Sequence, residues 1–117
     1  MEIQVGEYYR KKGFRVTYEY KLGEGKSVDI VADKDRKRIA IEIETGKSDT
    51  IYNIRKDLDC GFDKVISIAI KNKIKEKILL ELKKSGLDNE KRIKLLAITE
   101  FFPLTEREKR SGFNNEN

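Results

Sequence analysis

Apolar and polar residues alternate in three successive segments of the first half of the chain. Residues 14–20 alternate aromatic and aliphatic side chains with polar ones, and residues 27–32 and 38–44 are rich in Ile, Val and Ala. A period of two residues is typical of β-strands, because successive side chains point to opposite faces of a sheet. A glycine-rich turn at 21–26 and a polar loop at 33–37 separate the segments, so the pattern predicts a meander of three strands.

Helical periodicity precedes and follows this meander. An amphipathic helix is predicted over residues 3–12, ended by a glycine at 13. A second helix is predicted from Ser48 or Asp49, either of which can cap it, to about residue 60, with one apolar stripe at 51, 54 and 58. Residues 64–70 are apolar almost throughout. Such a run is typical of a strand covered on both faces, with a parallel neighbour reached through a crossover helix.

A lysine-rich helix at about 72–85 and an apolar strand at 93–98 complete the predicted order αβββαβαβ. The sequence therefore predicts an α/β fold with a mixed sheet flanked by helices. A chain of 117 residues can bury one hydrophobic core but not two, so we expect a single domain over 1–106. Residues 107–117 are polar and are expected to form a flexible tail.

The composition excludes several kinds of site. No His is present, which removes Ser-His and Cys-His catalysis and nearly every catalytic zinc centre. Cys60 has no partner for an intrachain disulfide, so a reducing cytoplasm is the expected compartment. No segment has the pattern of a signal peptide or the length of a membrane span, and no membrane contact is expected. A net charge of +5 fits either a polyanionic partner or a solvated lysine-rich surface.

The second and third strands carry acidic residues inside apolar runs. If the two strands pair as a hairpin, their apolar faces must match, which groups positions 28, 30 and 32 with positions 39, 41 and 43. Asp29 then shares the other face with Glu42 and Glu44. Neighbouring strands lie about 5 Å apart, so the three carboxylates are predicted to converge within reach of one hydrated cation.

Like charges so close together are unfavourable unless they are solvated, protonated or neutralised by a cation. Hard oxygen ligands without nitrogen or sulfur point to Mg²⁺ or Mn²⁺, ions that keep water and bind phosphate oxygens. The alternative is that the glutamates face water at a sheet edge and pair with Lys26, Arg38 or Lys47.

This arrangement resembles the PD-(D/E)XK nuclease superfamily, whose restriction-endonuclease-like fold has an αβββαβ core. Val28-Asp29 matches the first motif of that family, and Glu42-Ile43-Glu44 matches the second. The opening "GEYYRKKGFRVTYEY" is similar to archaeal Holliday-junction resolvases, in which a glutamate of the first helix can join the metal site; the matching residue is Glu7. The resemblance covers about residues 3–70, and the remaining αβ unit is an addition to the family core.

The chain departs from the family pattern at the lysine of the second motif, which is replaced by Glu44. This gives an E-X-E variant that some active restriction enzymes of the superfamily also show. Lys47 or Lys56 can supply the missing positive charge. Helical phase places Lys56 away from the apolar stripe of its helix, where it is predicted to face water, so Lys47 is the preferred candidate.

The resemblance implies a metal-dependent endonuclease that hydrolyses DNA phosphodiester bonds, structure-selective or weakly sequence-specific. Asp29 and Glu42 would hold the ion, and Glu44 or Lys47 would orient or deprotonate the attacking water. Two copies in a homodimer would provide two sites for two strands. The alternative is a catalytically inactive nuclease-fold module that binds nucleic acid or a protein. The candidate contacts to DNA are Arg10, Lys11, Lys12, Arg15, Lys21, Lys26, Asn53 and Lys56.

Overall fold

A computed structural model describes residues 1–102 of the chain, and the predicted tail at 107–117 lies outside the described residues. The order of elements agrees with the sequence pattern, with one short helix added at the end. The elements are α1 (Glu2–Lys11), β1 (Arg15–Gly23), β2 (Lys26–Lys34), β3 (Lys37–Glu44), α2 (Thr50–Asp59), β4 (Lys64–Ala69), α3 (Asn72–Lys84), β5 (Ile93–Ala97) and α4 (Ile98–Phe101).

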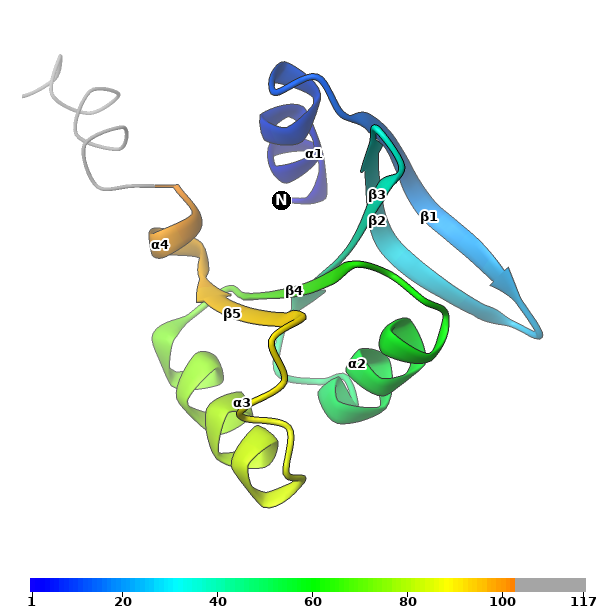
Figure 1. The fold of residues 1–117 in the computed structure, drawn as a ribbon. Coiled ribbons are helices and arrows are strands. Elements are labelled where there is room, and N and C mark those ends of the chain that lie inside the picture. The colour runs from blue at the N-terminus through cyan, green and yellow to red at the C-terminus, as the bar shows by residue number, and fades with distance from the viewer. Residues whose placement is uncertain (103–117) are drawn as a thin grey trace, which may run out of the picture.

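The five strands form one mixed sheet in the order β1-β2-β3-β4-β5. β1, β2 and β3 pair antiparallel as the predicted meander, whereas β3, β4 and β5 pair parallel. The parallel pairs are joined through α2 and α3, as the apolar run of β4 predicted. α1 and α4 cover one face of the sheet, and α2 and α3 cover the other (Figure 1). The protein is therefore a three-layer α/β fold.

Each face of the sheet carries its own apolar cluster. Val31 and Ala40 pack with Ile54 of α2 on one face, and Ile30 and Val5 pack together on the face covered by α1. Val65 to Ala69 of β4 are all buried, since this strand is covered on both faces. None of the helices among residues 1–102 is long and apolar enough to cross a membrane.

The predicted side-chain faces of β2 need one correction, at Val28. Ile30 packs toward α1 with the apolar residues of β3, as expected, but Val28 packs in the cluster beneath α2. The alternation breaks where the neighbouring strand β1 passes through Glu19, whose φ of 49° is left-handed. Tyr18 and Tyr20, on either side of it, also pack on opposite faces. Asp29 therefore lies at the point where both strands change face.

Two helix boundaries follow from local chemistry. α2 begins after Asp49, whose Oδ1 accepts a hydrogen bond from the Tyr52 amide at 3.1 Å, so Asp49 rather than Ser48 is the cap. The last strand was predicted to reach Ile98, but it ends at Ala97, and Ile98 begins α4. The chain turns there because Phe101 packs against the aromatic rings of α1.

Gly6 permits α1 to lie against the sheet, and its replacement provides a test of this packing. A methyl group at Gly6 would collide with the Tyr18 ring and hydroxyl. We expect Gly6→Ala to lower the free energy of unfolding by about 1–3 kcal/mol, the usual cost of overpacking. Urea unfolding measures this change, with Gln4→Ala on the exposed side of α1 as control. Equal stability of the two variants would contradict the close approach of α1.

Candidate functional site

Asp29 occupies the end of the β2–β3 pair, one residue beyond the last paired position of β2. Its Oδ2 accepts a hydrogen bond from the Ile43 amide at 2.8 Å, and its own amide points at Glu42 Oε1 at 3.5 Å. Burial raises the pKa of Asp29, while the Ile43 hydrogen bond opposes that shift. The side chains of Asp29 and Glu42 thus each approach a backbone amide of the neighbouring strand.

Glu42 and Glu44 point beneath α2 and are shielded from solvent. Glu42 is 3% exposed and Glu44 is 1% exposed. The hydroxyl of Thr50, the first residue of α2, donates a hydrogen bond to Glu44 Oε1 at 3.0 Å. The second oxygen of Glu44 is buried and has no hydrogen-bond partner within the described residues. Burial raises the pKa of Glu44, so this carboxyl is biased toward its protonated form.

Lys56 of α2 reaches the same place, and the prediction that it faces water is wrong. The residue is 9% exposed, and its Nζ lies 3.4 Å from Glu42 Oε2 and 2.6 Å from the Ser27 carbonyl oxygen, to which it donates a hydrogen bond. Helical phase fixes only the direction of Cβ. The flexible stem of a lysine can fold back along the helix and bring the ammonium to a buried acceptor.

Asp57 adds a further carboxylate that the sequence analysis did not select. It is 0% exposed, and its Oδ1 lies 3.6 Å from Lys56 Nζ. Burial raises the pKa of Asp57, although Glu42 and Lys56 oppose the shift. The sequence contained a signal for this position, because Asp57 falls within the Ile54/Leu58 stripe of α2 and an acid there must be buried.

A second group of acids lies on the other side of Asp29. Ligand oxygens of Glu2, Glu19 and Asp29 all lie within 4.8 Å of one another. Burial, followed by the nearby Asp29 and Glu19, raises the pKa of Glu2. Three oxygen ligands at this spacing have the chemistry that Mg²⁺ or Mn²⁺ requires. Asp29 is therefore placed to share an ion with α1 and β1, whereas Glu42 and Glu44, which were expected to converge with it, are not members of this group.

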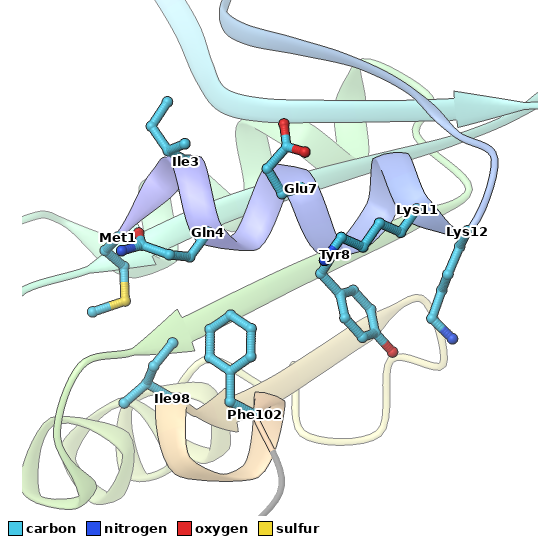
Figure 2. A pocket seen from close by; sticks show the side chains of 9 residues that line it. All are labelled: Met1, Ile3, Gln4, Glu7, Tyr8, Lys11, Lys12, Ile98 and Phe102. Atoms are coloured by element: carbon cyan, nitrogen blue, oxygen red, sulfur yellow. The ribbon is translucent and has the colours of Figure 1, made fainter. Parts of the chain in front are cut away.

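Glu7, the helix residue expected to join the metal site, is not part of the group formed by Glu2, Glu19 and Asp29. It lies 3.7 Å from Arg10 and lines the groove between α1 and α4 with Lys11 and Lys12 (Figure 2). Glu2 lies beside Asp29 because it shares the buried stripe of Val5, three residues on, whereas Glu7 is half a turn from it. Helical phase in the sequence could have shown this. Glu19 could not be found that way, because nothing in the sequence marks its left-handed backbone.

The structure separates the basic candidates into groups. Lys47 is exposed in the loop between β3 and α2. Lys21 and Lys26 flank the tip of the β1–β2 hairpin, near Asp29. Asn53 lies beside Lys56, with its Oδ1 at 3.5 Å from Nζ. Arg15 pairs with Asp33 at the open end of the hairpin. The remaining candidates lie at the C-terminal end of α1, away from Glu2; they are Arg10, Lys11 and Lys12.

The buried acids predict an unusual dependence of stability on pH. Burial and the neighbouring Asp57 raise the pKa of Glu42 from 4.5 to about 10. Between these values the folded state holds a proton that the unfolded state releases, so stability should fall as pH rises. We expect unfolding in EDTA to require less urea at about pH 9 than at about pH 5. Glu42→Gln should flatten this slope, and an unchanged slope in the variant would contradict the assignment to Glu42.

Comparison with known proteins bears on the fold. No model of a protein family matches the sequence, and no curated protein matches it. Among solved structures, the chain is similar to the crystal structure of a protein of unknown function, AF1548, with a TM-score of 0.54 and 17% sequence identity. The match covers 95% of this chain and 66% of the other. At this identity the similarity concerns the arrangement of helices and strands, and it agrees with the mixed α/β architecture.

Proposed function

We propose that this protein is a metal-dependent endonuclease with a restriction-endonuclease-like core, acting on DNA. One observation carries the proposal: a lysine ammonium lies 3.4 Å from the carboxylate of Glu42, whose other oxygen faces the amide of Asp29. Two acids from adjacent strands and one lysine are the components that the resemblance to the PD-(D/E)XK superfamily requires. In this chain the lysine comes from α2 instead of from the third strand.

The residues have separate roles in this proposal. Asp29 would hold the divalent ion, together with Glu42 on one side or Glu2 and Glu19 on the other. A bound Mg²⁺ or Mn²⁺ would stabilise developing charge on the scissile phosphate and acidify a bound water. Lys56 would orient that water or donate to the phosphate.

The surroundings of the site fit a polyanionic substrate. The β1–β2 hairpin extends beyond the rest of the sheet, with Lys21 and Lys26 exposed beside its tip (Figure 1). Lysines in this position would neutralise backbone phosphates without reading bases. The proposed cleavage is therefore structure-selective or weakly sequence-specific. We place it in the cytoplasm, and a homodimer would provide one site for each DNA strand.

The burial of Glu42 and Glu44 favours a second candidate. Glu42 is 3% exposed and already lies beside Lys56. Buried charged groups paired in this way can serve only to hold the fold together. In that case the protein would be an inactive nuclease-fold module that binds nucleic acid or a protein. Its acids and Lys56 would then stabilise the α2–sheet contact and would have no catalytic role.

Cleavage assays distinguish the two candidates. Branched, single-stranded and duplex DNA would be incubated with the protein and Mg²⁺ or Mn²⁺, with EDTA as the control. Cleavage that EDTA abolishes is the expected result. DNA binding without cleavage of any of these substrates would favour the inactive module.

A further inference from the structure

Asp57 is a buried acid to which the proposed nuclease mechanism gives no role. The residue is 0% exposed, and neither carboxylate oxygen has a hydrogen-bond partner within the described part of the chain. A buried carboxylate is strongly unfavourable unless a charge of opposite sign lies close to it. The cation beside it is Lys56, with 3.6 Å between Nζ and Oδ1.

Lys56 lies between acids that come from different elements. Glu42 approaches from β3 at 3.4 Å, and Asp57 approaches from α2 itself at 3.6 Å. The hydrogen bond to the Ser27 carbonyl at 2.6 Å fixes the ammonium against β2. Glu42 faces the backbone amide of Asp29 with its other oxygen, so it lies between the lysine and the proposed metal ligand. Asp57 is closed to solvent, and besides Lys56 the ionisable group that it influences most is Glu42, whose pKa it raises.

We propose that Asp57 is the positioning residue for Lys56: its carboxylate is the counter-charge that holds the ammonium at the site when Glu42 serves the metal. This inference rests on the proposed nuclease function for its consequence in catalysis. The ion pair itself does not depend on that function. No polar atom of Asp57 is accessible to a substrate, so it can act on the rate only through its neighbours Lys56 and Glu42.

Catalysis gives the first test. Asp57→Asn keeps the shape and removes the charge, and Asp59→Asn makes the same change at an exposed position of the same helix. We expect Asp57→Asn to lower kcat about 10–100-fold, the usual effect of losing a supporting partner of a site, with KM unchanged. Asp59→Asn should leave both constants unchanged. An unaltered kcat in Asp57→Asn, with the wild type active, would overturn the inference and leave the nuclease proposal intact.

A thermal-unfolding cycle in EDTA gives a second test that needs no activity. Asp57→Asn should lower Tm in the wild-type background, because Lys56 loses a counter-charge. In a Lys56→Met background the same change should raise Tm, because it removes a buried carboxylate that no longer has a cation. The same shift in both backgrounds would overturn the inference. A wild type without any cleavage would refute the nuclease proposal, and the sign reversal would still decide whether Asp57 pairs with Lys56.

Discussion

Lys56→Ala is expected to lower the rate of metal-dependent DNA cleavage by about a hundredfold or more, the usual cost of losing one donor to a transition state. Lys56 is the cation that the structure brings to Glu42, with 3.4 Å between Nζ and Oε2. Affinity for DNA should barely change, because a residue that is 9% exposed offers little to a phosphate backbone in the ground state. Single-turnover cleavage with excess enzyme measures the rate separately from binding.

Lys47→Ala is the matched control. Lys47 is exposed in the loop that follows β3, and its removal should leave the rate nearly unchanged. This ranking is the reverse of the one that the sequence favoured. A strong loss in Lys47→Ala with a normal rate in Lys56→Ala would show that the loop supplies the charge. Normal rates in both variants would point to Glu44 acting on the water.

Asp29→Asn is expected to abolish both cleavage and the stabilisation of the fold by divalent ions. A ligand that binds only the folded state adds about 2.7 kcal/mol at a concentration a hundredfold above Kd, and the variant should lose this increment. Asp29 is common to both sets of acids, since it faces Glu42 through the backbone and lies within 4.8 Å of Glu2 and Glu19. Calorimetric titration with Mn²⁺ and thermal unfolding with and without the ion measure the effect.

Variants of single acids then separate the two sets. Glu19→Gln should weaken ion binding if α1 and β1 hold the metal, whereas Glu42→Gln should weaken it if the two motif positions do. Glu7→Gln is the control, because Glu7 pairs with Arg10 beside the α1–α4 groove. Equal Mn²⁺ affinity of the wild type and Asp29→Asn would exclude a metal site at this end of the sheet.

Local periodicity predicted most of the fold. Alternation placed β1, β2 and β3, and the apolar run of β4 indicated a buried parallel strand. The register follows from matching apolar faces, and Ile30 indeed lies opposite Ile41. The two exceptions are the face of Val28 and the end of β5, which follow from the left-handed backbone of Glu19 and from the packing of Phe101 against α1. Neither cause is encoded in a two-residue or 3.6-residue period.

The periodicity of the sequence is enough to place Asp29 on β2 beside Glu42 and Glu44 on β3, because the period of a strand and the pairing of apolar faces leave few registers. Which other side chains meet them depends on the way the helices pack on the sheet. Lys56 lies 29 residues from Ser27, the acceptor of its hydrogen bond, and Glu2 meets Asp29 through the packing of α1 on the sheet. Such contacts depend on how helices pack and on how far a flexible side chain reaches around its own helix. Helical phase describes only the direction in which that side chain begins.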